Sequence, residues 1–265
     1  MLIKTNLFDS SAIRNIKQRK GAFSVLEYER DASVSPNAAQ MAFFFSEMNI
    51  RKKQLIIQLD GKTGVNVQAK AMQLMIGDID ATTDVKGARD LFKKIVSSAV
   101  TDETIIKPYY RGEGILVLEP TYRYIILEDL KEWPKGIVID DGMFLACEDT
   151  VEMDLSGRKN ASSLLFGQEG IVNSAFFGDG ILALESPVPR DEVIEVDLED
   201  SIIKIDGNMA IAWSPQLKFT VEKSMGTLVG SAVSGEGLVN VYEGTGKVWI
   251  APVRTNRGIS IPENE

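Results

Sequence analysis

The chain has 265 residues, of which 44% are apolar and 25% are charged, and its formal net charge is −9. It contains no histidine and a single cysteine, which excludes serine–histidine and cysteine–histidine catalysis, imidazole-ligated zinc and an intramolecular disulfide. The acidic balance disfavours nucleic acid as a partner. Without a secretory signal or an apolar run long enough to span a membrane, the protein is expected to be cytoplasmic.

The first fifty residues, 1–50, are expected to form an N-terminal extension packed on the body of the protein. Residues 22–29 have the composition of a strand. Ser35-Pro36 is typical of an N-cap followed by a first-turn proline, which predicts a helix that continues through residues 38–42. The run Phe43-Phe44-Phe45 either ends this helix or begins another strand.

A second helix is expected over about residues 84–100. Asp84 is a favourable N-cap residue, and apolar side chains then recur at the three- and four-residue spacing of one buried helix face. This helix is interpreted as an insertion into a chain that otherwise consists of strands.

The strongest internal signal is a motif that recurs every 66 residues. Gly112-Glu-Gly114-Ile-Leu-Val-Leu-Glu119 reappears as Gly178-Asp-Gly180-Ile-Leu-Ala-Leu-Glu185, and a third pair begins at Gly244-Thr-Gly246. Both offsets, 178 − 112 and 244 − 178, are 66. We therefore predict one repeat-built β domain over residues 51–253. Its units are about 51–111, 112–177 and 178–243, with a closing strand at 244–252 and a loose tail at 254–265.

Short strands separated by glycine-rich or acidic turns make up each copy. Residues 115–118, 124–127, 136–139 and 143–147 are four such strands in succession. The predicted fold class is all-β, with a double-stranded β-helix-like, β-prism or sandwich architecture. A structural role at tight corners or bulges is expected for the glycines of the repeated motif: Gly112, Gly114, Gly178, Gly180, Gly244 and Gly246.

Two fragments of catalytic motifs are better explained as turns. Gly61-Lys62-Thr63 matches the end of a phosphate-binding loop, but the position of the required upstream glycine is occupied by Ile56. Ser156 and Lys159 match the serine–lysine spacing of penicillin-recognising enzymes. The accompanying Lys-Thr-Gly at residues 62–64 precedes that pair, whereas in those enzymes it follows.

Carboxylates are the remaining candidates for chemistry. Glu195 and Asp197 share one face of an expected strand, whereas a metal site or an acid–base pair needs carboxylates that converge from separate strands. A solvated acidic face is the simpler interpretation, although a carboxylate- or metal-dependent hydrolase stays open. Cys147 is expected to be a small core residue, and the three tryptophans favour packing in the core or at a subunit interface.

Several separated motifs resemble one known family. They are residues 49–59, residues 67–72, residues 112–120, Ile139-Asp-Asp-Gly142 with residues 144–147, and Gly235-Glu-Gly237 with residues 244–249. Over about residues 45–253 they resemble the family of altered inheritance of mitochondria protein 24, whose prokaryotic members are mostly uncharacterised. The resemblance implies a β fold similar to that of the tryptophan RNA-binding attenuation protein, and it implies self-association. It also implies a scaffolding function, because the eukaryotic relatives are linked to mitochondrial inner-membrane organisation, and it defines no catalytic residues.

We therefore expect a structural or interaction protein that forms a homo-oligomer through β surfaces and is not an enzyme. The alternative is a module that binds a small ligand or a membrane surface. Tyr109, Tyr110 and Arg111, just before the first glycine pair, would form the rim of such a site. No cofactor or metal is expected. The expected partner is a second copy of the chain, and another protein or a membrane surface are the alternatives.

Overall fold

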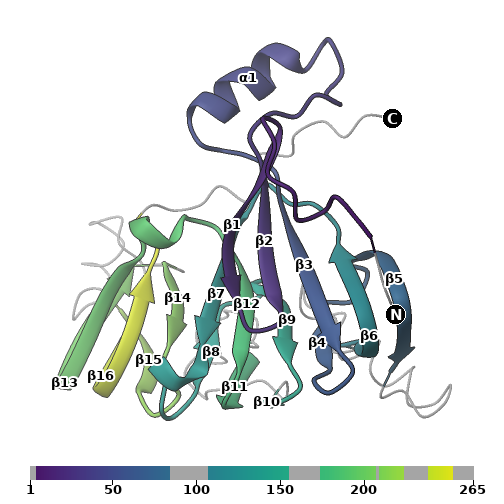
Figure 1. Ribbon diagram of the computed structural model, residues 1–265. Helices are drawn as coiled ribbons and strands as arrows, with labels where there is room; N and C mark the ends of the chain where they lie inside the picture. Colours follow the sequence, from purple (N-terminus) through teal and green to yellow (C-terminus); the bar gives the residue numbers. More distant parts are fainter. Residues whose placement is uncertain (1–3, 84–106, 155–173, 207–208, 224–237, 253–265) are drawn as a thin grey trace, which may run out of the picture.

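The computed structural model describes residues 4–83, 107–154, 174–206, 209–223 and 238–252, arranged as Figure 1 shows. Every strand pair among them is antiparallel. The strands form two curled sheets, so the all-β prediction is confirmed. The helix expected over residues 84–100 and the tail at 254–265 lie outside the described residues.

Among the described residues, the first sheet has nine strands. Its order is β1 (Arg14–Lys20), β2 (Phe23–Tyr28), β3 (Lys53–Asp60), β6 (Tyr109–Leu118), β4 (Val65–Val67), β9 (Phe144–Glu148), β12 (Ile181–Ser186) and β7 (Tyr124–Asp129), and β5 (Met72–Thr82) pairs with β6. The described part of the second sheet has seven strands. Its order is β10 (Val151–Asp154), β11 (Ser174–Gly178), β8 (Ile137–Ile139), β14 (Ala210–Trp213), β16 (Leu238–Ile250) and β13 (Ile194–Asp206), and β15 (Lys218–Lys223) pairs with β16.

Successive side chains of a strand point to opposite faces of its sheet, so the apolar residues of the described strands form separate core clusters. The first sheet curls on itself, because Thr121, just before β7, bridges to Lys53 at the start of β3, and its inward side chains fill the enclosed space. A second cluster lies between the two sheets and includes Ile126 from β7 and Trp249 from β16. A third cluster, around Trp213, is built from the second sheet.

The N-terminal segment adds two strands to the first sheet. The strand expected over residues 22–29 is confirmed as β2, which pairs with β3 and buries Phe23 completely. β1, which the sequence did not predict, pairs with β2 across the turn at Gly21. Leu7, Phe8 and Ile16 cover the outer face of these strands.

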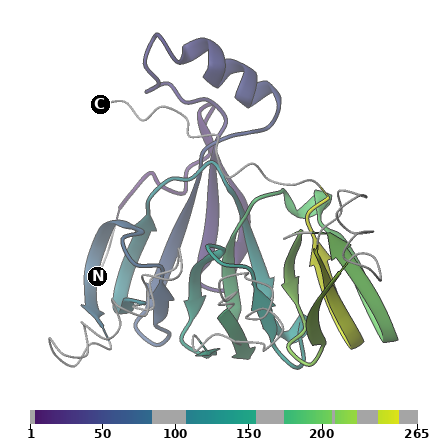
Figure 2. The ribbon, with the colours of Figure 1, turned by 180° about the vertical axis from the view of Figure 1, so that it is seen from behind.

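The helix expected after Ser35-Pro36 is present as α1 (Ala39–Glu47), but it begins later than predicted. Its N-cap position is Ala38, which makes no side-chain cap hydrogen bond, so the assignment of Ser35 as the N-cap is wrong. The Ser35 carbonyl instead accepts the Ala38 N–H in a preceding turn. The run Phe43-Phe44-Phe45 is helical. Figures 1 and 2 show α1 projecting away from both sheets.

Each repeated glycine pair lies where the chain exchanges one neighbouring strand for another. β6 pairs first with β4 and then with β3, and Gly112-Glu-Gly114 lies at the change. β16 pairs first with β15 and then with β14, on either side of Gly244-Thr-Gly246. Gly178-Asp-Gly180 connects β11, which pairs with β10, to β12, which pairs with β9.

Of these glycines, only Gly178 and Gly180 flank a turn between strands. The other two pairs lie inside the continuous strands β6 and β16. The bulge of β13 between Leu198 and Ser201 lies opposite Gly246 and Gly244 of β16. Gly112 and Gly244 adopt φ values of +136° and +124°, which side chains rarely tolerate. The 66-residue duplication itself stays a prediction.

Candidate interaction surfaces

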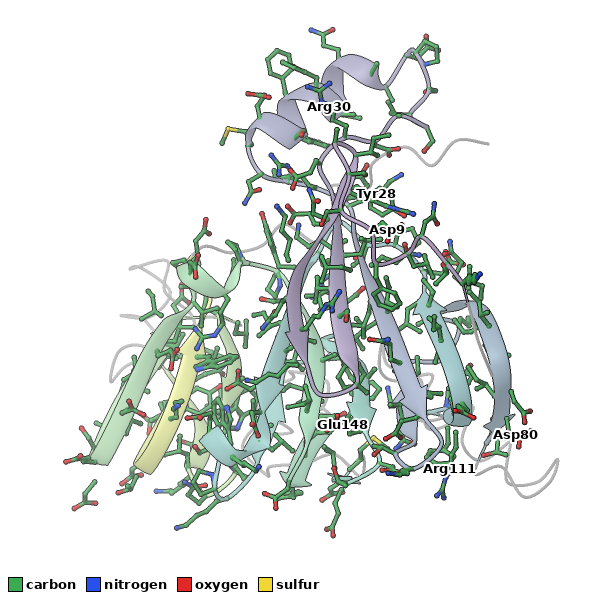
Figure 3. The ribbon with its side chains drawn as sticks, viewed as in Figure 1. Asp9, Tyr28, Arg30, Asp80, Arg111 and Glu148 are labelled. Atoms are coloured by element: carbon green, nitrogen blue, oxygen red, sulfur yellow. The ribbon has the colours of Figure 1, made fainter. Side chains whose placement is uncertain are left out.

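The three residues expected to form a ligand rim are divided between two faces of β6. Tyr110 points into the core of the first sheet and is 5% exposed, whereas alternation turns Tyr109 and Arg111 to the opposite face. The Tyr109 hydroxyl donates to Asp149 Oδ2 at 3.0 Å, and burial together with this carboxylate raises the pKa of Tyr109. Arg111 is paired in register with Asp80 on β5 (Figure 3). The structure therefore brings Tyr109 and Arg111 together, with a side-chain hydrogen bond between them, and leaves Tyr110 in the core.

Cys147 is a core residue, as its apolar neighbours predicted. The side chain is fully buried on β9, and burial raises the pKa of the thiol to about 12. The thiolate, which is the nucleophilic form, is therefore almost absent at neutral pH.

One carboxylate of β13, that of Glu195, is engaged by cations. Glu195 forms an ion pair with Arg190 and lies 3.9 Å from Lys247 Nζ. Partial burial opposes ionisation of Glu195, but the two cations outweigh it and lower the pKa of the carboxyl group. Within the described ranges, no three His, Cys, Asp or Glu side chains are placed to hold a metal ion.

Two tryptophans pack where the sheets meet, which is one of the two roles that the sequence favoured. The rings of Trp133 and Trp249 meet edge to face with centroids 5.3 Å apart. Trp133 Nε1 donates to Glu128 Oε1 at 2.9 Å, and burial raises the pKa of Glu128. Arg190 lies 4.4 Å from the Trp249 ring centroid, and Lys247 lies 5.2 Å from that of Trp133. This cluster is a packing contact and not an open pocket.

β5 is an edge of the first sheet. Among the described strands it pairs with β6 alone, so the backbone N–H and C=O groups on its other side have no described strand as a partner. Residues 71–77 carry no charged side chain. Within them Met72, Leu74 and Met75 are 38%, 37% and 41% exposed. An uncharged apolar stretch on an open edge is a surface suited to pairing with another strand.

β13 is an edge of the second sheet and lies at the opposite side of the molecule from β5 (Figure 1). It too exposes apolar side chains, Ile194 and Ile202. A bulge between Leu198 and Ser201 interrupts its pairing with β16, and Asp200 adopts a φ of +44° there. The strand also carries the acidic side chains Glu195, Asp197, Glu199, Asp200 and Asp206. Charges and bulges protect a sheet edge against further pairing. β5 also has a bulge, between Met72 and Leu74, but its residues 71–77 carry no charge, so β13 is the more strongly protected of the two edges.

α1 exposes a stripe of large apolar side chains. Met41, Phe44 and the C-cap residue Met48 recur at the spacing i, i+3, i+7 of one helix face and are 36%, 57% and 73% exposed. None of the nine helical residues is buried. The helix is tied to the β1–β2 hairpin by the Ser46 hydroxyl, which donates to the Glu29 carbonyl at 3.0 Å. None of the helices in the described ranges is long and apolar enough to cross a membrane.

Sequence reasoning did not identify β5 or α1 as exposed surfaces. Apart from Gln73, residues 72–76 are apolar without a clear alternation, a pattern that buried strands also show. Their exposure follows from a place at the sheet edge, which the local sequence does not encode. For α1, a signal was available: the spacing of Met41, Phe44 and Met48 describes a single helix face once residues 43–45 are assigned to the helix.

Comparison with known proteins gives three findings. The profile of the mitochondrial biogenesis AIM24 family matches residues 47–253. An uncharacterized protein of Streptococcus pyogenes serotype M6 is 26% identical over an alignment of 201 residues, and the match covers 73% of this chain and 79% of that protein. An X-ray crystal structure of a Streptococcus pyogenes protein matches with a TM-score of 0.56 at 24% identity, over 77% of this chain and 89% of that chain. The structural match bears on the fold alone.

Proposed function

The chain belongs to the mitochondrial biogenesis AIM24 family, and on that premise we propose that it is a non-catalytic interaction protein that self-associates through an open sheet edge. The observation that carries this proposal is the uncharged stretch of residues 71–77 at the start of β5. There Met72, Leu74 and Met75 are exposed beside backbone groups without a described strand partner. Pairing with a second chain would satisfy the backbone groups and bury the apolar side chains together.

Light scattering coupled to size-exclusion chromatography tests self-association. At micromolar concentration we expect a mass of at least twice the 29.2 kDa of the single chain. Dilution should lower the mass in a concentration-dependent way, as mass action requires. A mass of one chain at every concentration would refute self-association.

The non-catalytic part of the proposal rests on the chemistry of the available side chains. The chain has no histidine, the Cys147 thiol is held in its protonated form, and Glu195 is engaged by Arg190. Assays for hydrolysis of esters, phosphoesters and glycosides, run with and without added divalent metal, are expected to give background rates. A turnover that increases in proportion to the concentration of homogeneous protein would contradict this part of the proposal alone.

Binding to a membrane surface is a second candidate function, and the stripe on α1 favours it. Phenylalanine and methionine side chains on one helix face can enter the interfacial region of a bilayer. Because the net charge is −9, binding should be no stronger to anionic vesicles than to neutral phosphatidylcholine vesicles.

Co-sedimentation with phosphatidylcholine vesicles tests this second candidate. The double variant Phe44→Gln/Met48→Gln should lose binding, whereas Ile202→Gln, at an exposed apolar position on β13, should keep it. Equal sedimentation of both variants with the wild-type protein would exclude α1 as the contact.

A further inference from the structure

The sulfur-containing side chains of the described residues divide by exposure. Cys147 and Met143 are 0% and 1% exposed, and the partly buried Met153 and Met209 pack against core clusters. Four methionines are exposed: Met41 and the C-cap residue Met48 of α1, and Met72 and Met75 of β5. Within the described ranges, every exposed methionine therefore belongs to one of the two apolar surfaces, which Figure 1 shows on separate parts of the molecule.

Methionine supplies most of the apolar side chains on both surfaces. It provides two of the three side chains in the stripe on α1 and two of the three exposed large apolar side chains in the uncharged stretch of β5. The opposite edge strand, β13, exposes Ile194 and Ile202, which contain no sulfur. A reaction specific to thioethers would therefore alter both surfaces and leave β13 unchanged.

The single cysteine does not compete for an oxidant. A cysteine reacts with peroxides as its thiolate, and its susceptibility follows thiolate character and exposure. Cys147 is fully buried, and burial raises the pKa of its thiol to about 12, so it has neither property at neutral pH. A thioether has no proton to lose, and its polarisable sulfur stays nucleophilic across the physiological pH range. The exposed methionines are therefore the reactive sulfur of the described residues.

We propose that the four exposed methionines form a modification site for hydrogen peroxide. The thioether sulfur attacks one peroxide oxygen with a lone pair, so that an S–O bond forms while the O–O bond breaks. The sulfur is oxidised by two electrons, and the peroxide is reduced to water, which leaves with both peroxide protons. The product, methionine sulfoxide, is polar. Both surfaces thereby lose apolar character, while Met143 in the core is spared.

Oxidation of Met72 and Met75 would regulate self-association through β5, and this consequence rests on the proposed function. A polar sulfoxide that is buried at an interface without a hydrogen-bond partner costs free energy. Loss of one methylene-sized apolar contact at each of the two methionines would already raise the dissociation constant about tenfold. The oxidation itself needs only exposed side chains, so it can be tested apart from self-association.

Peptide mapping of the full chain tests the modification. Dilute folded protein, in which self-association does not cover β5, is treated with hydrogen peroxide at neutral pH, digested and searched by mass spectrometry for methionines that gain one oxygen atom. We expect the four exposed methionines to be oxidised before Met143, which reacts only when the chain opens, and the Cys147 thiol to stay free. In urea all methionines should react at similar rates. Folded protein in which Met143 reacts as fast as the exposed four, or in which Cys147 is consumed first, would overturn the proposal.

Paired variants test the consequence for self-association. Met72→Leu/Met75→Leu keeps two apolar side chains of similar volume on β5 but removes their sulfur. After peroxide treatment, the wild-type mass measured by light scattering should fall toward that of one chain, whereas the mass of this variant should not. Met72→Gln/Met75→Gln imitates the polar product and should raise the dissociation constant about tenfold without any oxidant. The matched control on α1, Met41→Leu/Met48→Leu, should dissociate after peroxide treatment as the wild type does.

The outcomes separate this inference from the proposed function. A wild-type mass of one chain before peroxide treatment refutes self-association and its regulation together, and the peptide map alone then decides the modification site. A wild-type mass that persists after Met72 and Met75 are fully oxidised overturns the regulation but leaves self-association standing. An equal loss of mass in Met72→Leu/Met75→Leu would mean that oxidation elsewhere in the chain causes dissociation, and it would overturn the assignment of the regulation to β5.

Discussion

Glu128 places a carboxyl group in the contact between the two sheets. It is 8% exposed, and burial raises its pKa above the ordinary value of 4.5, although Trp133 and Arg190 act in the opposite direction. A carboxyl group with a raised pKa binds its proton more tightly in the folded chain than in the unfolded chain. Its contribution to stability is therefore fully present below the unfolded pKa and is lost as the pH rises through the folded pKa.

The variant Glu128→Gln should remove this part of the pH dependence. Glutamine cannot ionise, yet its side-chain oxygen can still accept the hydrogen bond from Trp133 Nε1. We expect the free energy of unfolding of the variant to fall less than that of the wild type as the pH rises from 4.5 to 7.

Urea unfolding at a series of pH values measures the difference. The exposed substitution Glu132→Gln on η1 (Leu130–Glu132) is the control and should follow the wild type. A Glu128→Gln curve parallel to that of the wild type would show that the buried carboxyl group does not titrate in this range.

At the scale of elements, local sequence predicted the interior strands better than the edges. Residues 22–29 and 143–147 are apolar segments bounded by turn residues, and they form the buried strands β2 and β9. β5 was not predicted as an edge because its exposure depends on which strands come to lie beside it, not on its own residues. The division of residues 109–111 between two faces follows from strand alternation, which their adjacency had obscured.

Gly112 lets β5 and β6 approach at the point where β6 changes neighbours. Its φ is +136°, and a Cβ atom there would lie 2.1 Å from the Asp78 carbonyl oxygen. Gly112→Ala is therefore expected to lower the free energy of unfolding by about 2–4 kcal/mol, because it adds a backbone clash to the strain of the positive φ.

Gly61→Ala separates these two costs. Gly61 has a φ of +83°, but nothing lies within 4 Å of an added Cβ atom, so this variant carries the strain without the clash. We expect it to cost about 1 kcal/mol in chemical denaturation. Equal losses in the two variants would mean that the close approach of β5 contributes nothing.

At the scale of the whole molecule, the two sheets share an apolar cluster. The first sheet contributes Ile126 and Phe144, and the second contributes Phe176 and Trp249. The Phe144 and Phe176 rings stack with centroids 5.3 Å apart and planes 4° from parallel. Removing either sheet would expose this surface on the other. The described sheets should therefore unfold as one cooperative unit.

Trp249→Ala tests this cooperativity. The side chain is fully buried at the contact of the sheets, and its truncation should cost about 3–5 kcal/mol. Hydrogen exchange limited by global unfolding should then accelerate about 10²- to 4 × 10³-fold in peptides from β3 of the first sheet as well as from β14 of the second. Phe43→Ala, on the exposed surface of α1, should leave both unchanged. Because a shared cluster transmits the loss to both sides, acceleration confined to β14 would mean that the sheets are separate folding units.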